Sequence, residues 1–549
     1  MKVYDALAQA FVEEGTEAVF GLLGDANMFW VDALHKLGVP THEVRHEAAA
    51  TSMAEAWARV RGTPGVCTTT SGPGTAQITT PLVIAARDRV PLVAFCADSP
   101  AGEFSHNQRF DQARFAAAAE CGYVRVASAD SAYEAVRRAF TMARLESRPV
   151  MLGAPIDVQR SEFDDLEEYF PSTSLMTNEA TYPNPAALDR AVAAIEASER
   201  PVIIAGRGAV LSGAGEEILR LGDRIGALVA TSLLTLNWLR DGCEYHAGVA
   251  GLYATKTAME LFQESDCVIA VGASLNHYTT EHGYLFPDAT YVHIDTQPQV
   301  VMGTGRSAAC YVQADARVGV AALLDRLPTS GPPRTGYRVA EVHERLARAR
   351  VDTMAFDLQP GTLDPRAATL ALDEMIPAEV DLILGNGHQF NFWAMLCARE
   401  RPLTLVPKGF SAIGQGLSSA IGAMVATGGR PTFLVEGDAG FLMYLAEFET
   451  AVRLGLPLLV VVFNDQALGA ELHSMSEQDL DPELSKISTP DLGAVGVALG
   501  GRGRLVRDVE GLREGVAEYL AAPGPMIIDA RVSQSVVSIP TLRLRGHEV

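Results

Sequence analysis

Short apolar runs that alternate with helical patterns constrain the fold of this 549-residue chain more than any other feature. Strands buried on both faces of a parallel sheet appear as continuous apolar runs, and crossover helices must separate them. We therefore predict an α/β fold with mainly parallel sheets. The predicted strands are 66–70, 92–96, 150–154, 202–205, 267–271, 291–294, 382–385, 432–435, 458–463 and 526–528.

Two compositional breaks divide the chain into three blocks. Residues 161–187 are acidic and then rich in Ser, Thr and Pro, and residues 327–349 begin with a Pro- and Gly-rich run. Segments of this composition are typical of linkers. Because 48% of its residues are hydrophobic, the chain can form several cores, and its length suits about three or four domains. We expect three α/β domains, at 1–160, 188–326 and 350–549.

Charge and composition exclude several classes of function. The formal net charge of −23 argues against a nucleic acid or an anionic membrane as partner, since both require a basic surface. No apolar run approaches the ~18 residues of a membrane span, and the first residues follow an amphipathic helix pattern that differs from a signal peptide. The seven cysteines are not spaced as metal ligands, which indicates reduced thiols. We expect a cytoplasmic protein.

Two acidic side chains follow two predicted strands in the most informative segment, 434–469. Asp438 lies in the run Glu-Gly-Asp-Ala-Gly after one strand, and Asp465 follows the next strand. Ligands bind at the carboxyl edge of open α/β sheets, helix N-termini bind phosphate, and paired oxygen ligands suit Mg²⁺. The alternative is a structural turn with a capping Asp. One helix is expected between the strands, with an apolar face of Leu442, Leu445, Phe448 and Val452.

Further motifs lie upstream. Residues 385–389 (GNGHQ) end a strand, and 408–423 form a Gly-rich loop that opens a helix, which alone is a weak signal. Glu47 begins a helix within 44–50 (VRHEAAA), a place where most glutamates are surface residues stabilised by the helix dipole. A Gly-rich turn with the sequence SGPG follows at 71–74.

In combination these motifs resemble the thiamine-diphosphate-dependent enzymes of the acetolactate synthase and 2-oxo-acid decarboxylase group. The resemblance runs over nearly the whole chain. It implies that the domains at 1–160, 188–326 and 350–549 are the pyrimidine-binding, central and diphosphate-binding domains. The implied cofactors are thiamine diphosphate and Mg²⁺.

The resemblance also implies the binding residues. Asp438, Asp465 and the backbone carbonyl of Ala467 would hold Mg²⁺. Ala439 and Asp465 depart from the Gly and Asn of the family motif, but because Asp is still an oxygen ligand, we expect metal binding to survive. The implied coenzyme-binding residues are Glu47, Gly387, His388, Gln389, Ser411, Ile413, Gly437, Asp438, Ala439, Gly440, Asp465, Ala467, Leu468 and Gly469.

Glu47 matches the activating glutamate of the family. Its carboxyl group would hydrogen-bond the pyrimidine ring of the coenzyme and so promote formation of the carbon nucleophile, while the cofactor carries the difficult chemistry. In this family the glutamate and the Mg²⁺ site come from different subunits. The resemblance therefore implies a homodimer at minimum and favours a homotetramer.

Three more residues are candidates for catalysis beside Glu47. Asp25 lies in a Gly-Asp-Ala-Asn turn similar to that of the decarboxylases, and Glu471 follows Asp465 at the place of their catalytic Glu. His106 matches half of a His-His pair. Without such roles, the three would be an N-cap, a helix-face charge and a loop residue, respectively. Aromatic candidates for pocket walls are Phe29, Trp30, Phe390, Phe392 and Trp393.

The leading interpretation is an acetolactate-synthase-like carboligase. A 2-oxo acid would lose CO₂ to give a carbanion–enamine at coenzyme C2, which attacks a second carbonyl compound. Three further hypotheses are a decarboxylase that releases an aldehyde, because general acids at the site favour protonation, a lyase acting on acyloins or acyl-CoA, and a non-catalytic regulatory homologue.

The central domain carries a Gly-rich turn at 206–215 and the run HIDTQP at 293–298. The resemblance suggests an FAD site here. Ser274 stands where an Arg commonly follows the strand in the synthases, so an empty nucleotide-type fold is favoured over bound FAD.

Overall fold

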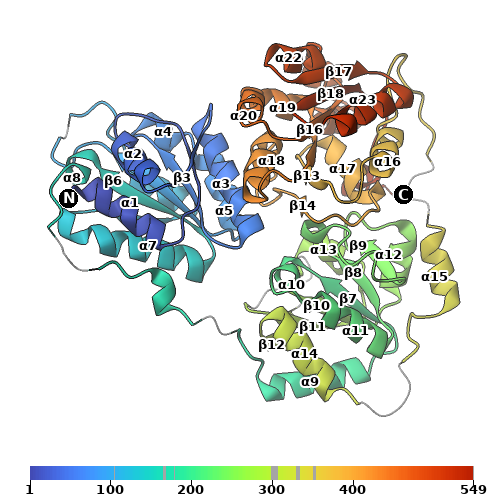
Figure 1. Ribbon diagram of the computed structural model, residues 1–549. Helices are drawn as coiled ribbons and strands as arrows, with labels where there is room; N and C mark the ends of the chain where they lie inside the picture. Colours follow the sequence, from blue (N-terminus) through green and yellow to red (C-terminus); the bar gives the residue numbers. More distant parts are fainter. Residues whose placement is uncertain are drawn as a thin grey trace.

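Three sheets organise the chain, and helices cover both faces of each (Figure 1). Every sheet has six strands, and all their pairings are parallel, which confirms the predicted α/β class. The computed structural model describes residues 1–103, 105–164, 168–177, 180–297, 307–328, 334–349 and 354–547. Parts of both predicted linkers and Pro298 of the HIDTQP run lie outside these ranges. Among the described residues, no helix combines the length and apolarity needed to cross a membrane.

The first sheet has the strand order β2-β1-β3-β4-β6-β5. Its strands are β1 (Val19–Gly21), β2 (Thr41–Glu43), β3 (Gly65–Thr69), β4 (Leu92–Asp98), β5 (Gly122–Arg125) and β6 (Pro149–Pro155). Its helices are α1 (Val3–Glu13), α2 (Met28–Lys36), α3 (Glu47–Arg61), α4 (Pro73–Ala76), α5 (Thr79–Arg87), α6 (Gln112–Ala118), α7 (Ala132–Glu146) and α8 (Ile156–Gln159).

The second sheet has the order β12-β11-β10-β7-β8-β9, which is the arrangement of dinucleotide-binding folds. Its strands are β7 (Pro201–Ala205), β8 (Leu228–Thr231), β9 (His246–Val249), β10 (Cys267–Val271), β11 (Thr290–Asp295) and β12 (Cys310–Gln313). Its helices are α9 (Pro185–Glu196), α10 (Arg207–Leu211), α11 (Gly215–Ile225), α12 (Lys256–Gln263), α13 (His277–Thr280) and α14 (Ala316–Arg326), and α15 (Ala340–Ala347) follows within the second predicted linker.

The third sheet has the order β14-β13-β15-β16-β18-β17, which repeats the order of the first. Its strands are β13 (Asp381–Leu384), β14 (Thr404–Leu405), β15 (Thr432–Gly437), β16 (Leu458–Asn464), β17 (Arg502–Val506) and β18 (Met526–Arg531). Its helices are α16 (Pro365–Met375), α17 (His388–Leu396), α18 (Gln415–Ala426), α19 (Asp438–Met443), α20 (Glu447–Arg453), α21 (Gly469–Glu477), α22 (Leu492–Ala498), α23 (Val509–Ala521) and α24 (Ile539–Leu544).

The predicted single helix after Asp438 is wrong, because the chain forms two helices, α19 and α20, with a break between them. The first domain contacts the chain at this break. The His46 ring meets the Tyr444 ring edge-on at 5.7 Å, and the Arg45 N–H donates to the Glu447 carboxylate at 2.9 Å. The contacts of another domain therefore coincide with the interruption of a helical pattern that is locally continuous.

Helix α3 of the first domain packs directly against α18 of the third (Figure 1). Buried side chains from both helices share one hydrophobic cluster, and a Cβ atom at Gly422 would lie 2.2 Å from the Met53 carbonyl oxygen. Ser52 and Gln415 form a buried hydrogen bond across the same interface. The helix that begins with Glu47 is thus fixed beside the helix that follows the loop of Ile413.

Candidate active site

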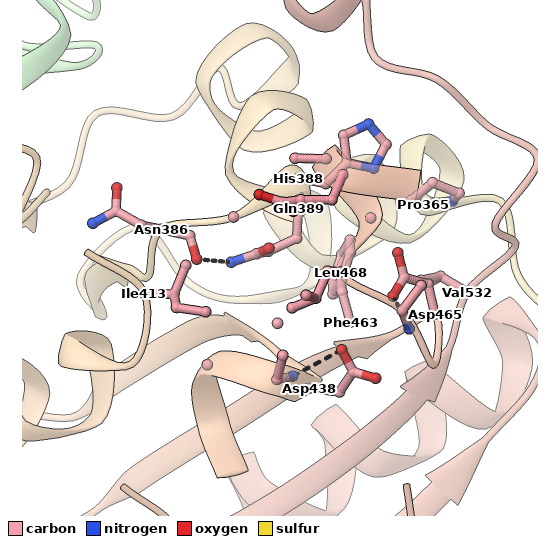
Figure 2. Close-up of a pocket in the computed structure, with 18 of the residues that line it drawn as sticks. Pro365, Asn386, His388, Gln389, Ile413, Asp438, Phe463, Asp465, Leu468 and Val532 are labelled. Atoms are coloured by element: carbon pink, nitrogen blue, oxygen red, sulfur yellow. Dashed lines mark hydrogen bonds between the residues drawn. The ribbon is translucent and has the colours of Figure 1, made fainter. Parts of the chain in front are cut away.

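A pocket of about 200 Å³ opens at the carboxyl ends of β13, β15 and β16 (Figure 2). The strand order changes direction between β13 and β15, and ligands of open α/β sheets bind at this switch point. The pocket is lined by Pro365, Asn386, Gly387, His388, Gln389, Phe392, Ile413, Gly437, Asp438, Ala439, Gly440, Phe463, Asp465, Ala467, Leu468, Gly469, Ala470, Glu471, Val532 and Ser533.

Every residue of the third domain that the sequence analysis assigned to the coenzyme lines this pocket, except Ser411. Ser411 is exposed and adopts a left-handed backbone with φ of +53°. Its hydroxyl donates to the Lys408 carbonyl at 3.3 Å, so the side chain stabilises the turn formed by residues 408–411. The role of Ser411 stays a prediction, while Ile413 of the same loop projects into the pocket (Figure 2).

Glycines let the backbone come close to a ligand here. Gly387 has φ of +143°, which only glycine adopts readily, and it precedes the first turn of α17. A Cβ atom at Gly469 would lie 2.5 Å from the Asp465 carboxylate. The starts of α17, α19 and α21 therefore border the pocket at turns that contain glycine, and helix N-termini of this kind suit a diphosphate.

Asp438 and Asp465 face each other across the pocket (Figure 2). Asp438 accepts hydrogen bonds from the N–H groups of Ala439 at 2.9 Å and Gln466 at 3.0 Å, and Asp465 accepts from Ala467 at 3.0 Å. Burial raises the pKa of both carboxyl groups, and repulsion from Asp438 raises that of Asp465 further. A divalent cation between them would relieve both costs, so this donor set fits Mg²⁺.

His388 and Gln389 form one wall of the pocket. The buried His388 ring accepts a hydrogen bond from the Ser538 N–H at 3.2 Å, and burial lowers its pKa well below the usual value. The ring is therefore neutral, and its other nitrogen remains a donor. Gln389 donates to the carbonyls of Gly385 and Asn386, which holds the turn before α17 in place.

Sequence reasoning missed Glu436, which lies fully buried beneath the pocket. A Cβ atom at Gly385 or Gly416 would lie 2.2 or 2.3 Å from its carboxyl group, so this group occupies the space that side chains would need. Burial raises the pKa of Glu436 to about 8. Hydrogen bonds from the backbone of Gly437 and Gly416 lower the pKa but do not offset the effect of burial. Its place inside an apolar run directly before Gly-Asp is the signal that could have identified it.

In the first domain, the loops of Asp25, Glu47 and His106 converge on residues 70–74. A Cβ atom at Gly24 would lie 2.5 Å from Thr70, and one at Gly74 would lie 3.0 Å from the Glu47 carboxylate. Gln108, two residues after His106, accepts a 2.5 Å hydrogen bond from the Ser71 hydroxyl. The structure thus brings the three candidate loops to one edge of the sheet, at its switch point between β1 and β3.

The three added catalytic candidates differ in their local surroundings. Asn27, not Asp25, precedes α2, so an N-cap role for Asp25 is wrong, and the Asp25 side chain is exposed. Glu471 lies in the first turn of α21, exposed at the rim of the pocket. The His106 ring accepts from the Gln108 N–H at 3.2 Å and so also shapes its own loop.

Most of the aromatic candidates are core residues. Trp30 is buried and stacks on Phe95, and Phe390 and Trp393 are fully buried in the core of the third domain. Phe29 stacks on Tyr4, away from the pocket lining. Phe392 alone among the five candidates lines the pocket.

A chain of contacts links Glu47 to the pocket. The residue before it, His46, packs against Tyr444, and a Cβ atom at Gly414 would lie 3.0 Å from the same Tyr444 ring. Gly414 directly follows Ile413, which lines the pocket. The start of α3 therefore lies beside the Ile413 end of the pocket, opposite the end where Asp465 lies.

The Gly-rich turn of the central domain is explained by packing. Cβ atoms at Gly206 and Gly208 would lie 2.4 and 2.8 Å from atoms of Gly272 and Ala273. These glycines are needed because two loops of the domain itself approach closely. FAD content stays a prediction.

Comparison with known proteins agrees with this geometry. The N-terminal TPP binding domain, central domain and C-terminal TPP binding domain of thiamine pyrophosphate enzymes match residues 1–117, 188–324 and 387–530. The acetolactate synthase large subunit of Parasynechococcus marenigrum is 30% identical over 96% of this chain and 87% of its own length. A probable acetolactate synthase large subunit of Methanocaldococcus jannaschii is 27% identical over 96% and 91%. A probable 2-ketoarginine decarboxylase of Pseudomonas aeruginosa is 28% identical over 96% and 93%.

The sheet topology, the pocket at the switch point and the three matching domain models agree over the length of the molecule. The chain therefore belongs to the thiamine pyrophosphate enzyme family, in the group that contains the acetolactate synthases and 2-oxo-acid decarboxylases.

Proposed function

We propose that this thiamine-diphosphate-dependent carboligase and decarboxylase acts on a 2-oxo acid and joins the remaining fragment to a second carbonyl compound. The observation that carries the proposal is the pair Asp438 and Asp465, held 27 residues apart at two strand ends of one glycine-lined pocket. The relatives named acetolactate synthase favour ligation as the main outcome.

The third domain would hold the phosphorylated end of the coenzyme. Asp438 and Asp465 would bind Mg²⁺ with the carbonyl of Ala467, and the amides at the starts of α19 and α21 would bind the diphosphate. Ile413, at the other end of the pocket, would support the coenzyme in its bent form. Because the two carboxyl groups repel each other in the absence of a cation, Mg²⁺ and diphosphate should bind together.

The first domain would act on the opposite end of the coenzyme. When bound, thiamine diphosphate supplies the carbon nucleophile that adds to the substrate carbonyl. Glu47 would hydrogen-bond the pyrimidine ring and hold a proton there. The carboxyl groups of Asp25 and Glu471 would hold or deliver protons near the substrate, and His106 would assist them.

We propose a homodimer as the smallest active unit and a homotetramer as the native form. The first and third domains are joined through the long segment 161–187 and the central domain, so α3 can pack on α18 of its own chain or of a second chain. A mixture of Glu47→Gln and Asp438→Asn proteins, refolded together, distinguishes the two arrangements. Recovery of about a quarter of the activity supports sites shared between chains, and no recovery shows that each site lies within one chain.

Release of an aldehyde is the second candidate function. The exposed carboxyl groups of Asp25 and Glu471 favour it, because general acids protonate the intermediate before it reaches an acceptor. The relative named 2-ketoarginine decarboxylase supports the same outcome. A lyase that cleaves acyloins or acyl-CoA, and a regulatory protein without catalysis, are weaker hypotheses that no specific contact of the described residues favours.

We also propose a cytoplasmic location, since all seven cysteines are free thiols in the structure.

One incubation tests the proposal. Purified enzyme with Mg²⁺ and thiamine diphosphate is given pyruvate and longer 2-oxo acids, and CO₂, aldehyde and acyloin are measured. CO₂ with acyloin supports the carboligase, and CO₂ with aldehyde supports the decarboxylase. Absence of CO₂ with every 2-oxo acid, while an acyloin or acyl-CoA is cleaved, contradicts both.

A further inference from the structure

A second hollow lies one strand away from the active-site pocket, at the same edge of the third sheet. It has a volume of about 420 Å³ and opens at the carboxyl ends of β16, β17 and β18. Ligands bind at this edge of open α/β sheets. The polar side chains that line it include Gln359, Thr362, Gln466, Arg507, Arg531 and Gln534.

Two arginines line the hollow, and they differ in how accessible their guanidinium groups are. Arg507 is exposed and donates to the Gly361 carbonyl at 3.1 Å, and no acidic side chain of the described ranges lies within 4.0 Å of it. Arg531 is only 8% exposed, and its guanidinium donates to Thr489 at 3.0 Å, the Pro490 carbonyl at 2.8 Å and Asp529 at 3.1 Å, so Arg507 is the arginine that a ligand in the hollow can reach.

The acidic residue in the lining of the hollow, Asp465, turns its carboxylate away from it. Asp465 lines it, but its carboxylate accepts from the Ala467 N–H on the side of the active-site pocket. A Cβ atom at Gly469, in that pocket, would lie 2.5 Å from the same carboxylate. The Asp465 carbonyl on the other side is covered by the Gln534 amide, which donates to it at 2.6 Å. The side-chain amides of Gln359, Gln466 and Gln534 already donate within the protein. The exposed Arg507 guanidinium is available to a ligand, and a guanidinium suits the planar oxygens of a carboxylate or phosphate.

Two of the lining residues also touch the proposed Mg²⁺ ligands. The Gln466 N–H donates to the Asp438 carboxylate at 3.0 Å, and Gln466 has a left-handed backbone with φ of +56°. Gln534 bonds the carbonyl of Asp465 and exchanges hydrogen bonds with Gln359 across the hollow. An occupant that orders Gln466 and Gln534 would bias the positions of both aspartates, which is the physical basis of coupling between two sites.

We propose that this hollow is an effector site for a small anion bearing a carboxylate or phosphate group, and that its occupation strengthens binding of the coenzyme. The site is distinct from the active-site pocket, and Arg507 is its principal recognition residue. The proposal rests on the proposed Mg²⁺ ligands only for the coupling, so anion binding can be tested independently of it.

Calorimetric titration of inorganic phosphate into the holoenzyme tests the site. Saturating Mg²⁺–thiamine diphosphate blocks the diphosphate pocket, and ionic strength is held constant with chloride. We expect one phosphate per chain in the wild type and in the control Arg513→Gln, which removes an exposed arginine 3.7 Å from Glu510 on α23. Arg507→Gln should weaken binding at least tenfold. Absence of phosphate binding to the wild type, or equal binding to Arg507→Gln, overturns the proposal.

Two further arms sharpen the result. Acetate replaces phosphate in the same titration, and the tighter ligand identifies whether a carboxylate or a phosphate is the natural group; binding of neither overturns the site. The dissociation constant of the coenzyme is then measured with and without saturating phosphate, by the quenching of protein fluorescence. A severalfold decrease in the wild type that is absent in Arg507→Gln supports the coupling, and an unchanged constant in both proteins overturns it.

Discussion

The first and third domains share one strand order but present different surfaces at the equivalent edge. In the third domain the edge carries a pocket with buried carboxyl groups whose pKa values are raised by burial. In the first domain the loops of Asp25, Glu47 and His106 meet at the edge, and the Asp25 side chain is exposed. The difference indicates a division of tasks, in which one domain binds a charged group tightly and the other offers side chains for proton transfer.

Glu47→Gln should separate the two tasks most clearly. Loss of the carboxylate should lower kcat by about 100- to 10,000-fold, the range for a positioned acid–base group. Affinity for the coenzyme should change far less, because the diphosphate contacts lie in the third domain. Steady-state kinetics and a coenzyme titration measure both quantities. Glu43→Gln, an exposed residue of β2, is the control, and equal losses in both variants would count against a role for Glu47.

Asp438→Asn should have the opposite signature. Mutation of residues that only hydrogen-bond a metal ligand typically lowers metal affinity by roughly 10- to 100-fold. Asp438 is itself a proposed ligand, so removing its charge should weaken Mg²⁺ binding by more than this. Activity should return in part at high concentrations of Mg²⁺ and coenzyme, which would not occur for Glu47→Gln. Titration of activity with Mg²⁺ measures this shift. A variant with unchanged Mg²⁺ dependence would remove Asp438 from the metal site.

Gly416→Ala should destabilise the fold beneath the pocket. The new Cβ would lie 2.3 Å from the buried Glu436 carboxyl group, and overpacking of this kind costs about 1–3 kcal/mol of the free energy of unfolding. Gly524→Ala is the matched control, since nothing lies within 4 Å of its Cβ position among the described residues. Chemical denaturation of the metal-free protein compares the two. Equal stability of both variants would show that the Glu436 side chain can move away from the new methyl group at little cost in free energy.

The effect of Glu436→Gln should be confined to the pH dependence of stability. The pKa of Glu436 is raised from 4.5 to about 8 in the folded protein, so the folded state keeps a proton that the unfolded state releases between these values. The free energy of unfolding should therefore fall as pH rises from about 4.5 to 8, and Glu436 adds to this fall. The Gln variant should lose that contribution. Chemical denaturation of the metal-free wild type and variant across this pH range measures the difference. If their plots of unfolding free energy against pH stay parallel, the account is contradicted.

The sequence was sufficient for the pairing of Asp438 with Asp465, because carboxyl ends of neighbouring parallel strands meet at one edge of a sheet. For Glu436 the sequence offers a partial signal, since a charge in an apolar run before Gly-Asp is conspicuous, but it does not indicate which loops close over that charge. The split between α19 and α20 was missed because it coincides with contacts to Arg45 and His46 of another domain, which the local sequence pattern does not encode.

Strand prediction shows the same limit. The ten apolar runs all form strands, whereas several short strands were missed, among them the buried interior strands β1 and β8 and the edge strands β5 and β17. β17 contains two arginines and is only partly buried, so its pairing with β18 depends on tertiary contacts that local composition does not encode.

The most direct test of the account is an experimental structure of the assembled enzyme with Mg²⁺ and thiamine diphosphate. We predict Mg²⁺ within about 2.1 Å of oxygens of Asp438 and Asp465, and a Glu47 carboxylate from the same or a second chain at about 2.7 Å from the pyrimidine ring nitrogen. A coenzyme bound at the Asp438 pocket with every Glu47 of the assembly beyond hydrogen-bonding reach would contradict it.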